Sequence, residues 1–308
     1  MKIVFQGAGA LGSYFGGRML EAGYDVSYFV RERRAKQLQE EGLKISSPVG
    51  DYENKDVEFY TNVEDVKEAD LLILAVKGYH LDDAIEQTAA IVRHTGAFVL
   101  PVLNGVEHIA RLKDACGEEK VLGGYASIIT TLNEKGHVLH TSGGSRIEFG
   151  PLHPEQESIC REIEKIDGTI KSSLVRTDNI LERMWYKYIF ITAFSGITSA
   201  TQLPAGYIAN TEATFQTIRR IFEEMCLLAE KEGVELNEAE VNRRLMSFRY
   251  LADDATSSMH QDLRKGLPLE VEHLQGGALR IAEKHGLSIP VIETIYGILK
   301  PYEKGRPN

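Results

Sequence analysis

Short apolar runs alternate with helix-like segments through the first half of the chain. The runs that predict strands are residues 2–5, 26–30, 71–76, 98–103 and 121–125. Strands that alternate with helices along a chain are typical of a parallel, doubly wound α/β sheet. The runs at 71–76 and 98–103 are almost wholly apolar, as expected for central strands that are covered by helices on both faces.

The hydrophobic pattern changes in the second half. Segments 136–140 and 146–149 alternate in polarity and flank the turn residues 141–144, which predicts a hairpin or meander that closes the sheet. From about residue 179 the apolar positions recur with a period near 3.6, and no strand is predicted. We therefore expect an N-terminal Rossmann-type α/β domain at residues 1–178 and an all-helical domain at residues 179–308, with residues 177–179 capping the first helix.

Composition narrows the classes of function. A length of 308 residues suits two domains, and 43% hydrophobic with 26% charged residues is typical of a soluble globular protein. The net charge of −10 argues against a general nucleic-acid surface, which needs clustered Lys and Arg. The longest apolar run, at 188–197, is far shorter than the roughly 20 residues of a membrane span, so no membrane partner is expected.

The cysteines and the N-terminus indicate a compartment. Cys116, Cys160 and Cys226 are too far apart for a metal knuckle and odd in number for a disulfide framework. Met1 leads almost directly into a predicted core strand, which leaves no room for a signal peptide. We expect a cytoplasmic protein. His260 and His273 lack the spacing of metal ligands, so no metal is expected.

The first predicted strand runs straight into Gly7-Ala8-Gly9-Ala10-Leu11-Gly12. A Gly-x-Gly-x-x-Gly between a strand and a helix predicts a dinucleotide held by backbone. Gly7 permits the tight turn, Gly9 lets the main chain approach a pyrophosphate, and Gly12 lets the helix pack close to the strand. The anion would be bound by N–H groups at the helix start. The alternative interpretation is a purely structural glycine turn.

Arg31 directly follows the second predicted strand. An NAD-specific site would place an acidic residue near this position, whereas a guanidinium suits the 2′-phosphate of NADP(H). The pattern therefore favours NADPH as cofactor. Two alternatives stay open: Arg31 could be the solvated start of a helix, and Glu32 could bind a ribose hydroxyl.

Lys77 and Asn104 follow the two most apolar strands. Open α/β sheets bind ligands at the carboxyl ends of their strands, which makes both side chains candidates for ligand binding. Asn104 is able to donate and accept hydrogen bonds, which suits a carbonyl or carboxamide group. An exposed loop lysine and an ordinary Asn-Gly turn are the alternatives.

Lys187 lies in the most apolar predicted helix. Burial lowers the pKa of a lysine, and such a lysine is a usable general acid for an oxygen that gains negative charge. The alternative is a lysine at the solvent end of the helix, with its stem on Trp185 and Tyr188. Glu270 starts a later helix, where the helix dipole favours a carboxylate, so a capping role suffices to explain it.

Taken together, these motifs resemble the ketopantoate reductase (2-dehydropantoate 2-reductase) family, NADPH-dependent enzymes of pantothenate synthesis. The likeness spans nearly the whole chain and rests on the glycine motif, Arg31, Val76-Lys77, Asn104-Gly105, Trp185 with Lys187, and Ser257-Ser258-Met259-x-Gln261-Asp262 followed by Glu270. It implies a Rossmann domain and a helical domain, with substrate and nicotinamide meeting between them.

The resemblance also implies a role for each matching residue. Lys187 would be the general acid that protonates the C2 oxygen as NADPH delivers hydride. Asn104 and Ser258 would orient the keto acid. Lys77 would help bind it near the nicotinamide, and Glu270 would position substrate and cofactor. On this basis Lys77, Asn104 and Glu270 belong to the cofactor site as well as to the substrate site.

The chain departs from the family pattern in its acid pocket. Ile191 and Ser195 stand where asparagines are usual, and Leu269 and Glu272 where threonine and aspartate are usual. Ser195 is able to substitute for an asparagine, but Ile191 is not. Three hypotheses follow: reduction of ketopantoate, reduction of another 2-keto acid or imine, and NADPH sensing without catalysis. A homodimer is compatible with the apolar helical domain.

Overall fold

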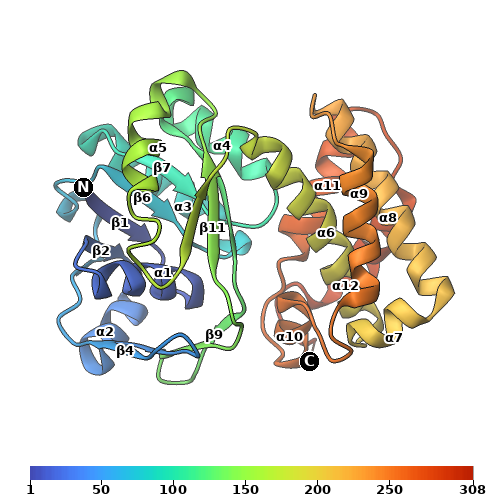
Figure 1. The fold of residues 1–308 in the computed structure, drawn as a ribbon, viewed down its shortest axis with the longest axis horizontal. Helices are drawn as coiled ribbons and strands as arrows, with labels where there is room; N and C mark the ends of the chain where they lie inside the picture. Colours follow the sequence, from blue (N-terminus) through green and yellow to red (C-terminus); the bar gives the residue numbers. More distant parts are fainter. Residues whose placement is uncertain (308) are drawn as a thin grey trace. The chain divides into compact units, whose positions relative to one another are not determined.

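The computed structural model describes residues 1–307 (Figure 1). The chain divides into two compact units. The first consists of Met1–Leu103 and His108–Ile180, and the second of Asn104–Glu107 together with the chain from Leu181 onward. The hydrophobic pattern of the sequence does not predict that residues 104–107 belong to the second unit.

A five-stranded parallel sheet forms the centre of the first unit. Its order is β5 (Phe59–Tyr60), β2 (Asp25–Phe29), β1 (Lys2–Gln6), β6 (Leu71–Leu74) and β7 (Phe98–Pro101). β2 lies beside one edge of β1, and the chain later crosses over to place β6 beside the other edge. The carboxyl ends of β1 and β6 therefore form the topological switch point at which such sheets bind ligands.

Helices cover both faces of this sheet. Ile3 and Phe5 of β1 pack in one apolar core with Phe15 of α1 (Ala10–Glu21), whereas Val4 packs in another with Ile91 of α3 (Leu81–Thr95). Successive strand residues point to opposite faces, so a strand that is covered twice must be apolar throughout. The predicted doubly wound sheet is confirmed.

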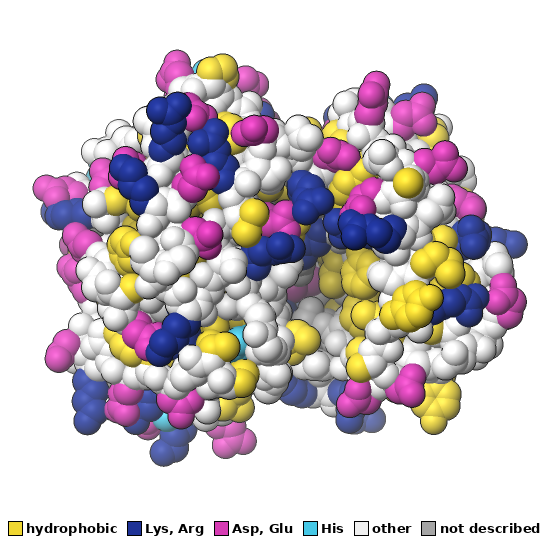
Figure 2. Space-filling model, viewed as in Figure 1, with side chains coloured by type: hydrophobic (Ala, Val, Ile, Leu, Met, Phe, Trp, Pro, Cys, Tyr) yellow, Lys and Arg dark blue, Asp and Glu magenta, His cyan; other side chains and the backbone are white. Residues whose placement is uncertain are grey.

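Two smaller sheets complete the first unit. One has the order β4 (Tyr52–Asn54), β3 (Leu43–Ser46), β10 (Val138–His140) and β9 (Thr130–Leu132), and the other has the order β12 (Ser173–Arg176), β11 (Arg146–Gly150) and β8 (Gly123–Ser127). The remaining helices are α2 (Glu32–Glu41), α4 (Glu107–Cys116) and α5 (Glu157–Glu164). Figure 2 shows acidic and basic side chains interspersed over the visible face of each unit.

The prediction that segments 136–140 and 146–149 form a hairpin or meander that closes the parallel sheet is wrong. β10 pairs with β3 and β9, whereas β11 pairs with β8 and β12, so the two strands belong to different sheets. His140 holds β10 in place, because its ring nitrogens lie 2.8 Å from Ser47 Oγ and 2.9 Å from Ser142 Oγ. The strand predicted at 121–125 begins beside the parallel sheet, where Val121 forms a parallel bridge with Val99 of β7, and continues as β8 in the mixed sheet with β11.

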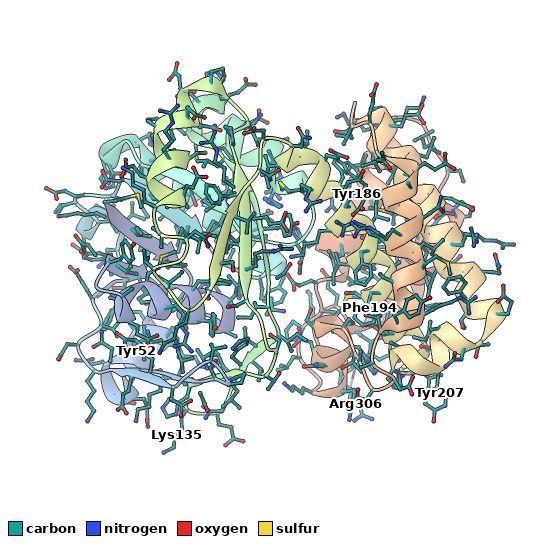
Figure 3. All side chains as sticks on the ribbon, in the orientation of Figure 1. Tyr52, Lys135, Tyr186, Phe194, Tyr207 and Arg306 are labelled. Atoms are coloured by element: carbon teal, nitrogen blue, oxygen red, sulfur yellow. The ribbon has the colours of Figure 1, made fainter. Side chains whose placement is uncertain are left out.

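The second unit is helical. Its helices are α6 (Ile180–Thr201), α7 (Ala205–Asn210), α8 (Glu212–Lys231), α9 (Glu238–Ser247), α10 (Ser258–Arg264), α11 (Val271–Lys284) and α12 (Pro290–Leu299). No strand occurs between residues 181 and 307, as predicted. Phe194, labelled in Figure 3, packs against Phe190 and Phe248 with ring centroids 5.8 and 5.9 Å away. Among the described residues, no helix is long and apolar enough to cross a membrane.

Candidate active site

The glycine motif joins β1 to α1. Gly7 has a φ of +102°, and a Cβ there would lie 2.8 Å from the Ala75 carbonyl oxygen. A Cβ at Gly12 would lie 2.1 Å from the carbonyl oxygen of Gly7. Only glycine is tolerated at these two positions, because L side chains rarely adopt the first conformation and backbone blocks the second. The roles predicted for the tight turn and the close helix agree with this geometry.

Gly9 differs from the other two glycines. It is exposed, its φ of −68° is ordinary, and a Cβ there would meet no atom within 4 Å. The first helical bond runs from the Ser13 N–H to the Gly9 carbonyl at 2.9 Å, so the preceding N–H groups have no acceptor within the helix. An open helix start of this kind binds anions. The loop therefore fits a pyrophosphate.

Gly9→Ala is expected to weaken NADPH binding about tenfold or more without changing the melting temperature. The added methyl group would project into the space that a pyrophosphate needs, while the fold around it has room. Calorimetry with NADPH and thermal unfolding measure the two effects. Gly143→Ala is the matched control, because Gly143 also lacks neighbours within 4 Å. Unchanged NADPH affinity in Gly9→Ala would contradict the assignment.

Arg34 supports the glycine motif from α2. Its guanidinium donates to Ser13 Oγ and to the Gly136 carbonyl, both at 3.0 Å, and Ser13 Oγ donates to the Ala8 carbonyl at 2.9 Å. Burial lowers the pKa of Arg34. Sequence reasoning missed this residue, since nothing in its spacing distinguishes it from the neighbouring arginines.

Arg31 and Lys77 lie at the carboxyl ends of strands, as predicted. Arg31 is the residue before α2 and is 57% exposed, with its guanidinium 3.3 Å from the Asp83 carboxylate on α3. Lys77 follows β6 and is half-buried. Glu32 is the exposed first residue of α2. Arg31 therefore offers an accessible cation beyond β2, where the 2′-substituent of a dinucleotide is bound in this type of sheet.

Asn104 is held by the helices of the second unit. Its carbonyl accepts a 2.6 Å hydrogen bond from His273 Nε2 of α11. Nearby, Glu107 accepts two 2.7 Å hydrogen bonds from Arg280 of the same helix. Gly105 between them has a φ of +77°, and a Cβ there would lie 3.4 Å from His273 Nε2. His273 and Arg280 thus position Asn104, although they lie 169 and 173 residues from their partners in sequence.

On the substrate-binding role that the family resemblance implies for Asn104, Arg280→Ala is expected to raise KM for the keto acid about threefold to fivefold, with little change in kcat. The Arg280–Glu107 pair is partly exposed, with exposed fractions of 43% and 22%, so its loss costs about 1 kcal/mol or less. Steady-state kinetics provide the measurement. The control is Lys284→Ala, which removes another cation of α11, one that pairs with Glu232 at the end of α8. Identical KM values in both variants would show that Arg280 does not position Asn104.

Lys187 lies within the first two turns of α6. The neighbouring side chains Trp185, Tyr186 and Tyr188 are buried, with exposed fractions of 1%, 2% and 1%, whereas Lys187 has intermediate burial. The Trp185 and Tyr188 rings lie 5.7 Å apart, and the Tyr188 hydroxyl donates to the Leu274 carbonyl at 2.6 Å. Lys187 is therefore a partly buried lysine on a helix whose neighbouring aromatic side chains are fixed by their own contacts.

Ser195 lies two turns farther along α6 and is completely buried. Its Oγ has no hydrogen-bond partner, and neither have Thr192 Oγ1 and Ser199 Oγ on α6 or Gln275 Oε1 on α11. Buried polar atoms normally have a hydrogen-bond partner, so these atoms of α6 and α11 are available to bind a ligand. Ile191 is partly buried and offers none.

The serine motif and Glu270 lie at the starts of two helices. Ser257 caps α10 by accepting from the His260 N–H at 3.1 Å, and its Oγ is 2.9 Å from Thr198 Oγ1 of α6. Ser258 is the exposed first residue of α10. Glu270 precedes α11 and is 6% exposed, but its carboxylate makes no capping hydrogen bond. Glu270 thus lies at the start of a helix, as predicted, where the helix dipole favours a carboxylate. Its ψ of 22° is not the extended conformation in which a side chain at this position bonds to the helix N–H groups.

The departure at Glu272 has a structural explanation. Its carboxylate accepts from the Tyr296 hydroxyl at 2.8 Å and pairs with Arg280 and Lys300. Glu272 therefore ties α11 to α12. Within residues 1–307, no group of His, Cys, Asp and Glu side chains could hold a metal ion.

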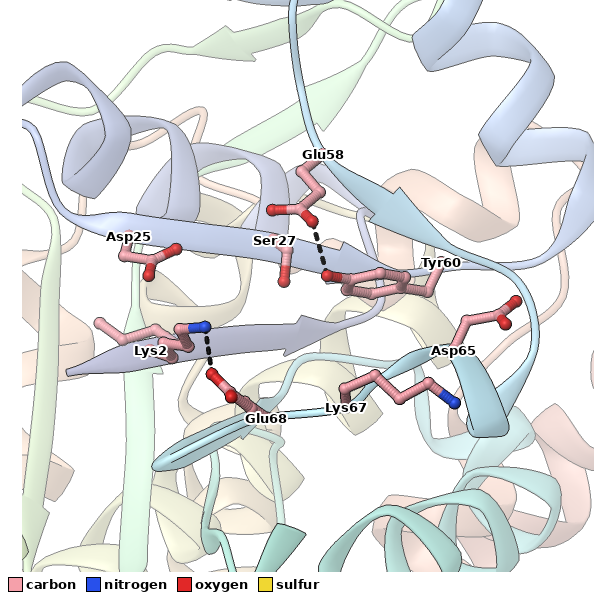
Figure 4. Close-up of a pocket in the computed structure, with 9 residues that line it drawn as sticks. Lys2, Asp25, Ser27, Glu58, Tyr60, Asp65, Lys67 and Glu68 are labelled. Carbon is pink, nitrogen blue, oxygen red and sulfur yellow. Dashed lines mark hydrogen bonds and ion pairs between the residues drawn. The ribbon is translucent and has the colours of Figure 1, made fainter.

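A separate pocket of about 310 Å³ opens at the amino ends of β1 and β2 (Figure 4). Its charged groups largely satisfy one another: Lys2 pairs with Glu68, and the Tyr60 hydroxyl donates to Glu58 at 2.6 Å. Because the glycine motif follows the carboxyl end of β1, this pocket lies at the opposite end of the strand and is not the nucleotide site.

A doubly wound sheet with this glycine loop defines the class of dinucleotide-binding α/β proteins, and here the chain continues into a helical unit. Residues 3–154 match the family described as Ketopantoate reductase PanE/ApbA, and residues 179–303 match its C-terminal part. The chain belongs to the ketopantoate reductase (PanE/ApbA) family.

Individual relatives extend over the whole chain. It is 35% identical over 306 residues to the uncharacterized oxidoreductase YkpB of Bacillus subtilis (strain 168), covering 98% of this chain and 99% of that protein. It is 28% identical over 306 residues to the 2-dehydropantoate 2-reductase of Pyrococcus abyssi (strain GE5 / Orsay), covering 98% of each.

Solved structures share the fold. A PanE/ApbA family ketopantoate reductase from Ralstonia eutropha JMP134 superposes with a TM-score of 0.85 at 26% identity, covering 98% of each chain. The ternary structure of D-mandelate dehydrogenase with NADH and anilino(oxo)acetate superposes with a TM-score of 0.88 at 21% identity, again over 98% of each chain. The latter similarity concerns the fold alone.

Proposed function

We propose that this protein reduces ketopantoate to pantoate with NADPH, and that Lys187 is the general acid. The observation that carries the proposal is the half-buried Lys187 among buried aromatic side chains of α6, in a chain whose glycine loop fits a dinucleotide. An ammonium group in such surroundings stabilises and protonates a developing alkoxide.

In this proposal, residues of the first unit bind the cofactor and Lys187 of the second unit transfers the proton. The backbone of residues 7–12 binds the pyrophosphate, and Arg31 binds the 2′-phosphate. Bound NADPH supplies a hydride to the C2 carbon of the keto acid. Lys187 donates a proton from Nζ to the C2 oxygen and is then reprotonated from solvent, so the carbonyl becomes a secondary alcohol.

The remaining site residues orient the substrate. Asn104 and Ser258 bind the keto acid through amide and hydroxyl groups. Lys77 adds a positive charge for its carboxylate, and Glu270 fixes substrate and cofactor. Ser195 contributes its unpartnered hydroxyl where an asparagine is usual in the family.

A second candidate, reduction of another 2-keto acid or an imine, is favoured by Ile191. Its apolar side chain removes a hydrogen bond from the acid pocket, which would disfavour a substrate that carries a hydroxyl group there. The scaffold and the proton donor would be the same.

Steady-state oxidation of NADPH and NADH with ketopantoate and a panel of 2-keto acids and imines tests these proposals. The first proposal predicts that ketopantoate with NADPH has by far the highest kcat/KM. Preference for another substrate supports the second candidate. Tight NADPH binding without turnover of any substrate would instead indicate a sensing protein.

We further propose a functional division near Asp178 and a cytoplasmic location. The three cysteines are free, as expected in a reducing compartment, and burial raises the pKa of each thiol to about 11, which makes them unreactive at neutral pH.

A homodimer through the second unit is the proposed assembly. Exposed aromatic side chains such as Tyr207 (Figure 3) and Tyr250 support it, and sedimentation velocity tests it.

A further inference from the structure

Arg31, His80 and Asp83 form a cluster beside the end of β2. The terminal nitrogens of Arg31 lie 3.3 Å from His80 Nε2 and 3.3 Å from the Asp83 carboxylate. His80 is the half-buried residue before α3, and its ring packs edge-on against Tyr79 with centroids 4.6 Å apart. Asp83 is 76% exposed in the first turn of α3.

The cluster changes its charge with protonation of His80. The charged groups that act on His80 are Arg31, which precedes α2, and Asp83 on α3. Burial and the Arg31 charge lower the pKa of His80, against the weaker opposing effect of Asp83. The neutral ring then accepts a hydrogen bond from Arg31 through Nε2, since a guanidinium only donates.

A phosphate dianion on Arg31 would reverse this balance. It would repel the Asp83 carboxylate and compete with it for the guanidinium. It would also favour protonated His80, whose Nε2 would then donate to a phosphate oxygen instead of accepting from Arg31. Both neighbours of Arg31 therefore respond to the charge that separates NADPH from NADH.

We propose that His80, in its protonated form, is a second ligand of the 2′-phosphate, and that Asp83 is a competing carboxylate that occupies Arg31 in the free protein. This proposal rests on the proposed use of NADPH and assigns its specificity to residues beyond Arg31. The role of His80 makes NADPH recognition dependent on pH, whereas NADH recognition is not.

The sign of the pH dependence follows from linkage. If the phosphate raises the pKa of His80, binding takes up a proton, and affinity falls by up to about tenfold per pH unit as pH rises between the free and bound pKa values. The second ionisation of a phosphate monoester, near pH 6, acts in the opposite direction. Measurements between about pH 6.5 and 8.5 avoid most of that effect.

The test uses adenosine 2′,5′-bisphosphate as probe and adenosine 5′-monophosphate as the ligand without a 2′-phosphate. Calorimetry is performed at both ends of the pH range on the wild type, His80→Gln, Asp83→Asn and the control Asp82→Asn. Asp82 is a neighbouring exposed carboxylate that pairs with Arg111. Proton NMR follows the His80 ring, which is assigned by its loss in His80→Gln.

We expect the wild type to bind the bisphosphate about tenfold more tightly at pH 6.5 than at 8.5, with a raised His80 pKa in the complex. His80→Gln should abolish this slope, and Asp83→Asn should tighten binding about threefold, unlike Asp82→Asn. An equal slope in His80→Gln, or an unchanged His80 pKa, overturns the role of His80. Unchanged affinity in Asp83→Asn overturns the role of Asp83.

Turnover of ketopantoate with saturating NADPH is measured separately. If bisphosphate affinity depends on pH as expected but ketopantoate is not turned over, the proposed reaction is refuted and the roles of His80 and Asp83 are supported. If turnover is normal but the affinity does not depend on pH, only the role of His80 is refuted.

Discussion

Lys187→Ala is expected to lower kcat for keto-acid reduction by about 10²–10⁴-fold, the usual contribution of a general acid. The alkoxide that forms on the C2 oxygen would lose both its proton donor and the nearest positive charge. NADPH binding should remain within about twofold of wild type, because in our proposal Lys187 acts on the substrate and not on the dinucleotide phosphates. Single-turnover oxidation of bound NADPH measures the chemical step directly.

Two further variants separate proton transfer from charge and from folding. Lys187→Arg keeps the charge but carries a proton of much higher pKa, so it should also lose at least about 10²-fold in kcat. Lys284→Ala removes a lysine from α11 that we assign no role in the reaction, and should behave as wild type. Full turnover in Lys187→Ala, with an unchanged melting temperature, would contradict the assigned acid.

Gly12→Ala is expected to destabilise the first unit by about 3 kcal/mol or more. The added Cβ would lie 2.1 Å from the Gly7 carbonyl oxygen, and this neighbour is backbone that cannot rotate away. To accommodate it, α1 must move off β1, which disturbs the core around Phe15. Thermal unfolding should show a melting temperature lower by roughly 10 °C, and NADPH binding should be lost.

The comparison with Gly9→Ala makes this result diagnostic. The two glycines are three residues apart, yet a Cβ at Gly9 would meet open space. Gly9→Ala should therefore lose affinity with a normal melting temperature, whereas Gly12→Ala should lose both. A melting temperature of Gly12→Ala equal to that of Gly143→Ala would mean that α1 does not pack against the loop as described.

The sequence predicts the central strands well because their physical signal is strong. Strands covered on both faces are continuous apolar runs, as at β1, β6 and β7. Short strands such as β5, which has two residues, contain too few side chains to show an apolar run or an alternation of polar and apolar positions. The predicted hairpin failed for another reason: alternation shows that a strand has one buried face, but not which neighbour it pairs with.

The positions of the candidate site residues could be predicted where a local motif carries them, as at the glycine loop and at Arg31. Contacts between distant segments could not. His273 and Arg280 hold residues 104–107 from more than 160 positions away, and no spacing rule connects them. Residue type and pattern predict Glu270 at the start of a helix, as found, but backbone dihedrals decide whether its carboxylate bonds to the helix N–H groups, and the sequence does not show them.

The proton donor to the C2 oxygen is the central claim of this account, and a crystal structure with NADP⁺ and ketopantoate tests it most directly. The oxidised cofactor cannot reduce the substrate, so the complex is stable enough to observe. We expect the Lys187 Nζ atom about 2.6–3.2 Å from the C2 oxygen, within hydrogen-bond reach. A Lys187 ammonium group in bulk water, with the C2 oxygen bound by a different donor, would contradict the account.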